Sequence, residues 1–470
     1  MSTTIKFGTD GWRAIIAREY TVENVIRVAT ATALWMQRND MKTAVVGHDC
    51  RFAGELFAET TARVFADHDI KVKLAKGFVS TPMVSLGVVK LKADLGIVIT
   101  ASHNPPDYNG FKLKSALGGP TLPKDIAAVE ALIPDEAPAT HQELADLKEA
   151  VAEGLIEYVD LEQLYLDHVA DNFNLDLIRS SGLVVAYDAM YGAGQTAMRK
   201  ILPDAVHLHS EYNPSFMGQA PEPIHRNLKE LSETIAADPS IALGIANDGD
   251  ADRIGMYDAD GNFVDSHHIL LLLLKYMREE KKMDGKVIIT FSVTDKMKKL
   301  AQHYGLDHEV TKIGFKYIAE IMSREDVIVG GEESGGLAVK GHIPERDGIW
   351  IGLTILEFMA KTGKSLKELV QEVYGLVGSF AFDRDDLHID DAKKHAIIRS
   401  AGAGEYKQFG KYNIVKVEDT DGYKFYLDGD DRWVMIRPSG TEPVLRVYAQ
   451  APTQTEVREV LDATHATLGS

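Results

Sequence analysis

The sequence contains a single cysteine, Cys50, among its 470 residues. One thiol can form neither a disulfide within the chain nor a thiolate metal cluster, which is typical of proteins in a reducing compartment. Basic residues are also in deficit: Lys and Arg number 51 against 70 Asp and Glu, a formal net charge of −19. The electrostatic field of this negative charge repels nucleic-acid backbones and anionic membranes, so we expect no nucleic acid and no membrane as partners.

Long apolar runs are missing as well. The most apolar stretch, "ILLLLLKYM" at 269–277, is far too short to span a bilayer. The first residues, "MSTTIKFGTDGWR", lack the apolar core of a secretion signal. We therefore expect a cytoplasmic protein, and the sequence leaves a monomer and a homodimer equally open.

Length and periodicity predict several α/β domains. The chain is too long for one core, and its 45% hydrophobic content allows large ones. Short β-rich runs alternate with amphipathic helical stretches, the pattern of parallel α/β units. The predicted strands include 43–49, 95–100, 183–189 and 286–292. An acidic stretch at 141–169 is predicted to be helical and to bridge the first two units.

The last part of the chain has a different pattern. Alternating strands at 411–420 and 423–438 surround turns, and a terminal helix is predicted to begin near Thr453. This pattern predicts a small α+β domain. The predicted domains are therefore three related α/β sheet domains, at 1–150, 151–262 and 263–378, and the α+β domain at 379–470.

The strongest chemical signal is "NDGDADR" at 247–253, which follows the buried run "IALGIA". Asp248, Asp250 and Asp252 repel one another unless a cation neutralises them, and hard oxygen ligands suit Mg²⁺ or Ca²⁺. An EF-hand is excluded, because Arg253 occupies the position that requires glycine and Ala259 the position of the bidentate Glu. A solvated acidic turn would not need the buried strand before it, so we favour a Mg²⁺ loop.

Another polar loop, "TASHNPPDYNGFKL" at 100–113, follows the apolar run "LGIVI". Loops collect Asn, Pro and Ser for turn chemistry alone. The alternative is that Ser102 stands at a strand end as a nucleophile.

Further loops carry polar groups suited to sugars or phosphates. "RPSGTEP" at 437–443 combines a guanidinium with hydroxyls and N–H groups, as in a phosphate cradle, although a simple hairpin turn explains it equally well. "GGEESGG" at 330–336 offers carboxylates to sugar hydroxyls. Neighbouring segments contribute three further candidate substrate-binding residues, Lys316, His342 and Arg346, although ordinary surface charge explains each of them equally well.

Together these loops resemble the motifs of the α-D-phosphohexomutase superfamily, from "FGTDGWR" to "RPSGTEP", in the family's order. The resemblance implies four domains around a central cleft, with Ser102 as the phosphorylated serine and as a Mg²⁺ ligand beside Asp248, Asp250 and Asp252. It implies that the sugar is read by Glu332 and Ser334. The phosphate that does not react would be held by Arg437, Ser439, Gly440 and Thr441.

The resemblance also implies a mechanism. Phosphorylated Ser102 would pass its phosphoryl group to a hexose phosphate, giving a 1,6-bisphosphate that turns over and returns the other phosphate to the serine. Lys112 and His103 would manage the hydroxyl proton, and Arg13 and Arg253 would balance negative charge.

One position departs from part of the family. Several members that accept mannose or glucosamine phosphates end the sugar loop with histidine, and here that residue is Gly336. Together with Arg346 in "GHIPERDG", this favours glucose. We therefore predict a phosphoglucomutase, with a phosphomannomutase or dual-specificity mutase as the alternative. A non-catalytic sugar-phosphate-binding relative is disfavoured, because a binder has no use for a nucleophile facing Mg²⁺.

Overall fold

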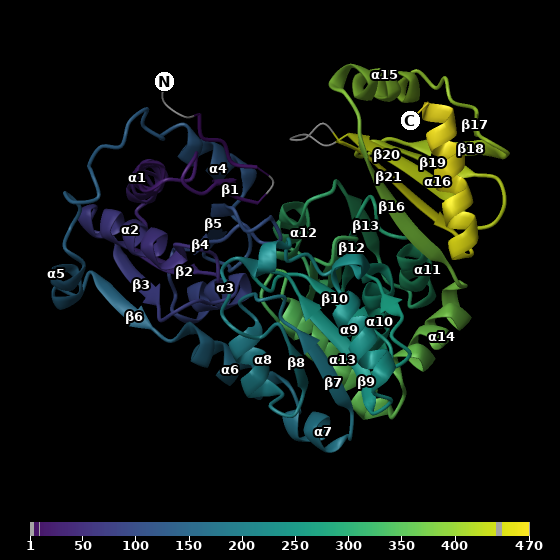
Figure 1. Ribbon diagram of the computed structural model, residues 1–470, viewed down its shortest axis with the longest axis horizontal. Helices are drawn as coiled ribbons and strands as arrows, with labels where there is room; N and C mark the ends of the chain where they lie inside the picture. Colours follow the sequence, from purple (N-terminus) through teal and green to yellow (C-terminus); the bar gives the residue numbers. More distant parts are fainter. Residues whose placement is uncertain (1–3, 9, 439–443, 470) are drawn as a thin grey trace. The chain divides into compact units, whose positions relative to one another are not determined.

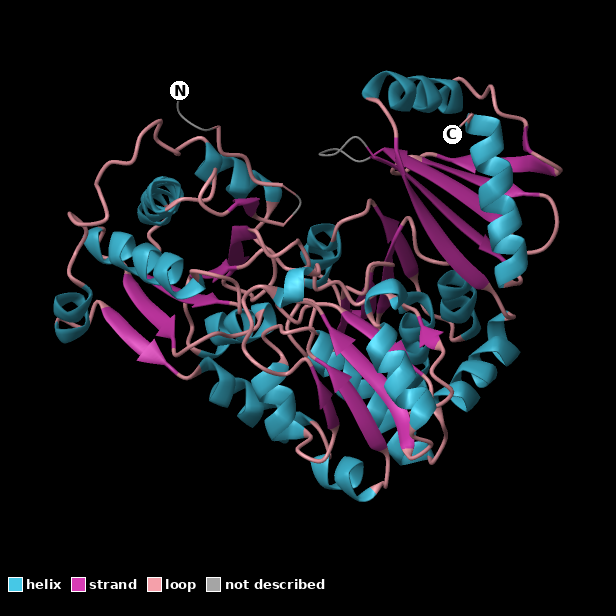
Figure 2. Cartoon of the chain, in the orientation of Figure 1, coloured by secondary structure: helices cyan, strands magenta, loops and turns pink. Residues whose placement is uncertain are grey.

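The computed structural model describes residues 4–8, 10–438 and 444–469. Its described residues form four β-sheets, each accompanied by helices (Figures 1 and 2). By compactness the chain divides into two units, one of residues 1–288 with 314–370 and one of residues 289–313 with 371–470. Among the described residues, no helix combines the length and apolar character needed to cross a bilayer.

The first sheet has the strand order β1-β5-β4-β2-β3-β6, with β2, β3, β4 and β6 parallel and β5 antiparallel to both β1 and β4. β4 is buried at each residue, as expected for a strand covered on both faces. The strands are β1 (Trp12–Ile15), β2 (Thr43–His48), β3 (Lys71–Ala75), β4 (Leu95–Ile99), β5 (Tyr108–Ser115) and β6 (Ile156–Val159). The helices are α1 (Val22–Arg38), α2 (Gly54–Asp67), α3 (Thr81–Lys90), α4 (Pro123–Glu130) and α5 (Leu147–Ala152).

The predicted continuous helix at 141–169 is wrong. The segment contains α5, then β6, and then the start of α6 (Leu161–Asn172). Gly154 adopts a positive φ after α5, and Ile156 then packs into the first core, so "IEYV" pairs with β3 as a parallel strand. The first sheet thus extends past residue 150.

The second sheet has the order β11-β10-β9-β7-β8. Its strands are β7 (Val184–Asp188), β8 (Val206–Leu208), β9 (Ile241–Asn247), β10 (Ile254–Tyr257) and β11 (Phe263–Val264). The helices and 3₁₀ turns of this region are α6, α7 (Leu175–Ser180), α8 (Gln195–Ile201), η1 (Phe216–Gly218), η2 (His225–Asn227) and α9 (Lys229–Ala237). The apolar residues of β9 bury against α9, which leaves the strand's carboxyl end at Asn247 to begin the aspartate loop.

The third sheet has the order β13-β12-β14-β15. Its strands are β12 (Lys286–Thr290), β13 (His308–Thr311), β14 (Val327–Gly331) and β15 (Leu337–Val339). Its helices are α10 (Ser266–Glu279), α11 (Lys296–His303), α12 (Phe315–Met322), α13 (Gly348–Thr362) and α14 (Leu366–Val377). α13 begins where Asp347 caps the backbone N–H of Trp350, directly after the loop that carries Arg346.

The fourth sheet is antiparallel, in the order β16-β21-β20-β19-β18-β17. Its strands are β16 (Ala381–His388), β17 (Gln408–Phe409), β18 (Tyr412–Glu418), β19 (Tyr423–Leu427), β20 (Trp433–Pro438) and β21 (Val444–Ala451). Helices α15 (Asp391–Gly402) and α16 (Gln454–Leu468) contribute to the same apolar core. The mixed fold, three α/β sheet domains and an antiparallel C-terminal one, confirms the predicted fold class.

Candidate active site

Three buried carboxylates gather in the loop between β9 and β10. Asp248, Asp250 and Asp252 each offer a ligand atom within 4.8 Å of the others. One oxygen of Asp250 and one of Asp252, both Oδ1, have no hydrogen-bond partner among the described residues. Buried, unpartnered carboxylate oxygens are costly unless a cation satisfies them, so this donor set fits a metal ion.

Ser102 lies against this loop. It follows β4, has a left-handed φ of 51°, and its Oγ donates a 2.7 Å hydrogen bond to Asp248 Oδ2. The ring of His103 is close by, with Nδ1 3.3 Å from the same Oγ. The two loops touch at Gly249, where a Cβ would stand only 2.5 Å from the carbonyl oxygen of Ser102. Glycine is therefore required where the serine loop (residues 100–107) meets the aspartate loop (residues 248–253).

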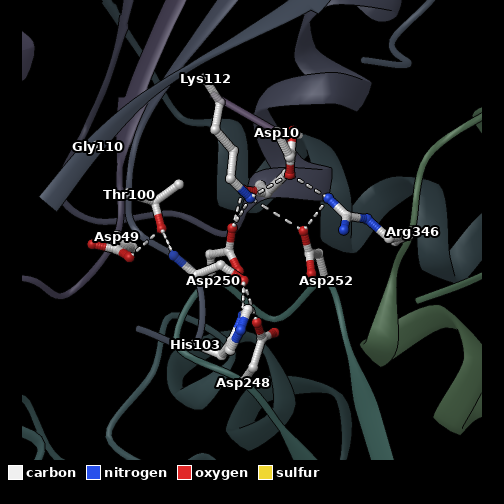
Figure 3. A network of polar contacts seen from close by, with 12 residues as sticks. Asp10, Asp49, Thr100, His103, Gly110, Lys112, Asp248, Asp250, Asp252 and Arg346 are labelled. Atoms are coloured by element: carbon white, nitrogen blue, oxygen red, sulfur yellow. Dashed lines mark hydrogen bonds and ion pairs between the residues drawn. The ribbon is translucent and has the colours of Figure 1, made fainter. Parts of the chain in front are cut away.

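Lys112 of β5 connects the aspartates to the N-terminal segment (Figure 3). Its Nζ lies 2.8 Å from Asp250 Oδ2, 3.3 Å from Asp252 Oδ2 and 3.0 Å from Asp10 Oδ2. Burial opposes the charge of Lys112, but the three carboxylates outweigh it and raise the pKa of this ammonium. Its observed contacts are those of a fixed cation, while the proton-carrying role of Lys112 stays a prediction.

Arg346 completes the ion network from the loop before α13 (Figure 3). Its Nη2 lies 2.5 Å from Asp10 Oδ2 and 2.7 Å from Asp252 Oδ2. Glu345 beside it accepts a 2.6 Å bond from Lys114, which is also fully buried. Segments from three sheets thus meet at one buried cluster of alternating charge.

The pKa values follow from this crowding. Burial, together with Asp250 and Asp252, raises the pKa of Asp248 well above its usual range. Burial also acts on Asp250, but Lys112 outweighs it and lowers that pKa. Burial and the charges of Arg253 and Arg13 hold the pKa of His103 well below its usual value.

The predicted sugar loop also reaches this cluster. Glu332 lies at the end of β14, and burial raises its pKa to about 7 against the opposing charge of Arg346. A backbone bridge pairs Gly336 with Arg253, so the loop that contains Glu332 and Ser334 joins the aspartate loop directly. A Cβ at Gly336 would stand 2.5 Å from Cδ of Arg346. The glycine thus allows the Arg346 side chain to lie across it.

Arg13 and Arg253 border the serine loop. Nη1 of Arg13 donates a 2.7 Å bond to Asn104 Oδ1. The backbone N–H of Arg253 donates to Asp248 Oδ1 at 2.9 Å, and its guanidinium lies 3.8 Å from Glu222. The charges of both arginines contribute to the lowered pKa of His103.

Two predicted residues make other contacts. His342 stacks on Trp350 with ring centroids 3.8 Å apart, and its Nε2 lies 2.9 Å from Asp347 Oδ2. Its Nδ1 lies 3.3 Å from His168, in a cluster that joins α6 to α13. Lys316 stands near the start of α12 with its ammonium 5.4 Å from the ring of Tyr317. Among the described residues, neither forms a hydrogen bond or an ion pair with the three aspartates, and their substrate-binding roles stay predictions.

The predicted phosphate cradle falls in the second compact unit. Arg437 ends β20 with its Nε 3.2 Å from Asp421 Oδ1. It stands directly opposite Arg446 of β21 in the antiparallel register, and Nε of Arg446 lies 3.8 Å from Asp386 Oδ1. Ser439, Gly440 and Thr441 lie outside the described residues.

Several residues of the cluster escaped sequence reasoning. They are Asp10, Asp49, Arg51, Thr100, Lys114 and Glu345. Asp10 lies inside "FGTDGWR" and Glu345 inside "GHIPERDG", both already noted as motifs, so a charged residue in each was an available signal.

The chain matches all four domain models of phosphoglucomutase/phosphomannomutase. The alpha/beta/alpha domains I, II and III match residues 4–139, 163–261 and 265–376, and the C-terminal domain matches 390–466. A phosphoglucosamine mutase of Corynebacterium aurimucosum is 30% identical over 473 residues, covering 97% of both chains. A phosphoglucomutase/phosphomannomutase of Thermococcus kodakarensis is 29% identical over 464 residues, covering 97% of this chain and 96% of the relative.

A solved structure agrees with these matches. A Thermus thermophilus protein described as a phosphomannomutase superposes with a TM-score of 0.88 at 33% identity, over 100% of both chains. The fold and these relatives define an enzyme, an intramolecular phosphotransferase of the isomerase class. The chain belongs to the α-D-phosphohexomutase superfamily.

Proposed function

We propose that the protein is a phosphoglucomutase, which interconverts glucose 1-phosphate and glucose 6-phosphate through a phosphoserine at Ser102 and a 1,6-bisphosphate intermediate. The observation that carries this proposal is the 2.7 Å contact between Ser102 Oγ and Asp248 inside a cluster of three buried carboxylates. A hydroxyl in that position is placed for phosphoryl transfer, which depends on alignment and charge neutralisation more than on covalent chemistry.

Mg²⁺ is the proposed cofactor, held by Asp248, Asp250 and Asp252 with Ser102 beside them. The unpartnered Oδ1 atoms of Asp250 and Asp252 supply hard oxygen donors. When bound, the ion would neutralise charge that develops on the transferred phosphoryl group.

The residues around Ser102 have distinct roles in the proposed reaction. In the first half-reaction the bond between Ser102 Oγ and phosphorus breaks as a bond forms between phosphorus and a sugar hydroxyl oxygen. The hydroxyl's proton needs an acceptor, and we assign this part to the His103 imidazole, whose Nδ1 lies 3.3 Å from Ser102 Oγ. Lys112 and Arg346 keep Asp250 and Asp252 in place, and Arg13 and Arg253 add positive charge. In the second half-reaction the other phosphate returns to Ser102.

The choice of glucose rests on Gly336. A histidine there would need space that the Arg346 side chain occupies, so this loop offers one side chain fewer to the sugar. A contact to a single hydroxyl is worth about 1 kcal/mol, so the preference over mannose can be modest. The names of the relatives support a second candidate, a mutase that acts on mannose or glucosamine phosphates.

Turnover of a substrate panel tests the proposal. We expect the highest kcat/KM for glucose 1-phosphate, a lower value for mannose 1-phosphate, and a lower one for glucosamine 1-phosphate, all with Mg²⁺ and a trace of glucose 1,6-bisphosphate. A higher kcat/KM for mannose 1-phosphate or glucosamine 1-phosphate would show that the enzyme prefers that sugar. No turnover of any of the three would contradict the proposed function.

A further inference from the structure

Arg51 lies beneath the serine loop without contact to solvent. It follows β2 in the sequence "HDCRF", and its side chain is 0% exposed. Its two terminal nitrogens donate to four backbone carbonyls of the loop that holds Ser102. The acceptors are Ser102 at 2.7 Å, Asn104 at 2.6 Å, Pro105 at 2.7 Å and Tyr108 at 3.0 Å. One buried guanidinium thus binds four backbone carbonyls at once.

Asp49 holds the other backbone group of the same serine. Its Oδ2 lies 3.4 Å from Nε of Arg51 and accepts a hydrogen bond from the hydroxyl of Thr100. That hydroxyl in turn accepts from the backbone N–H of Ser102 at 2.9 Å. Both polar backbone groups of Ser102 therefore lead to a single buried ion pair, Arg51 with Asp49.

This arrangement fixes an unfavourable backbone conformation. Ser102 has a φ of 51°, a left-handed conformation that is unfavourable for a residue with a Cβ and persists only where the surroundings enforce it. Because the N–H and the C=O are both held, the Cα–Cβ bond has one direction left, and Oγ reaches Asp248. The carbonyls of Ser102 and Asn104 both accept from Nη2 of Arg51, so His103 between them has little freedom to move.

We propose that Arg51, together with Asp49, is a positioning residue that holds Ser102 and His103 in their reactive geometry. The inference rests on the proposed function for its effect on turnover, but the clamp itself does not. Lysine cannot replace Arg51, because a single ammonium cannot reproduce a planar fork that reaches four carbonyls. Loss of the clamp lowers kcat by about 100-fold, the effect of displacing a reacting group by about 1 Å.

Arg63 provides a matched control in the same domain. It also donates to three backbone carbonyls, at 2.7–3.0 Å, but those belong to Ala145, His141 and Leu144. Replacement of Arg63 therefore removes a carbonyl clamp of the same kind at a segment that no proposed catalytic residue occupies.

The test compares R51K, R51A, D49N and R63A in the full-length protein with its metal. Hydrogen exchange is measured for peptides that cover 101–110 and 141–145, and kcat and KM are measured with glucose 1-phosphate. We expect exchange at 101–110 to accelerate about tenfold or more in the Arg51 variants, and exchange at 141–145 to accelerate in R63A only. We also expect kcat to fall in the Arg51 variants with KM within about threefold, and added guanidinium ion to restore part of the kcat of R51A but none of that of R63A.

Retained protection at 101–110 in folded R51K would overturn the proposal, as would equal kcat losses in R51A and R63A or a change confined to KM. If R51A fails to fold, R51K and the isosteric D49N decide the same question. If the wild-type protein turns over no hexose phosphate, the proposed function fails. The exchange measurement then still decides the clamp, with lost protection supporting it and retained protection overturning it.

Discussion

The two oxygens of Asp250 have different surroundings, and this residue shows how the site is built. Oδ2 accepts bonds from Lys112 at 2.8 Å and Thr81 at 2.6 Å, while Oδ1 has no partner among the described residues. The first oxygen is used to orient the carboxylate, and the second has the unpartnered state that the proposed metal site requires. This division explains why Asp250 is fully buried yet incompletely bonded.

Asp250→Asn should lower kcat by at least about 100-fold, since removing one carboxylate leaves the metal charge poorly matched at the transition state. Activity should be measured after chelation and over a Mg²⁺ titration. Asp260→Asn is the control, because Asp260 is an exposed aspartate whose carboxylate lies 2.6 Å from the ammonium of Lys367. Equal activity of D250N and the wild type at saturating Mg²⁺ would remove Asp250 from the metal site.

The sequence predicted the residues whose neighbours lie within their own motif. Asp248, Asp250 and Asp252 alternate in one loop, so their mutual repulsion can be read directly from the sequence. Arg51 and Asp10 could not be found this way, because their partners lie far along the chain and their meeting depends on how strands β2, β4 and β5 assemble. Lys112 was predicted, but its fixation by three carboxylates depends on the same assembly.

At the level of elements, the parallel strands bring together groups that no motif marks. His209 follows β8, and its Nδ1 lies 3.0 Å from both oxygens of Asp188 at the end of β7. Its Nε2 lies 3.2 Å from Glu230 of α9. The hydrogen bond to Asp188, with the charges of both carboxylates, raises the pKa of His209 to about 9.

This shift predicts a loss of stability at alkaline pH. A folded-state pKa above the unfolded value of about 6.5 means that protonated His209 stabilises the fold fully below pH 6.5. That contribution should disappear as pH rises through about 9. The melting temperature of the wild type should therefore fall more between pH 6.5 and 9 than that of His209→Gln. Parallel pH dependences in the two proteins would show that His209 contributes nothing.

Element boundaries were predictable where periodicity was unbroken. The strand before the aspartates ends at Asn247, as the run "IALGIA" predicts, and Thr453 caps α16 where a terminal helix was expected. The segment at 141–169 was misassigned because its acidic, apolar spacing suits a helix, whereas β6 exists through its pairing with β3. Such tertiary pairing overrides local propensity.

At the scale of the whole molecule, the resemblance to the phosphohexomutases predicts that Arg437, in the second compact unit, holds the phosphate that does not react. A guanidinium–phosphate pair contributes about 1.5–3 kcal/mol, so Arg437→Ala should raise the KM for glucose 1-phosphate about tenfold or more. Phosphorylation of Ser102 by glucose 1,6-bisphosphate should survive, and more bisphosphate should escape per turnover. Arg458→Ala is the control, because Arg458 of α16 pairs with Asp385 of β16 and with Asp462 of its own helix. An unchanged KM and an unchanged ratio of released bisphosphate to product would show that Arg437 does not bind the phosphate.

In the proposed mechanism, Ser102 carries the phosphoryl group between the two positions of the sugar. The most direct measurement is intact mass and peptide mapping of the protein after incubation with glucose 1,6-bisphosphate. The same measurement is then repeated after addition of glucose 1-phosphate. We predict one phosphoryl group on the peptide that contains Ser102, its loss to the added sugar, and neither event in Ser102→Ala. A phosphoryl group on another residue, or full mutase activity in Ser102→Ala, would contradict the account.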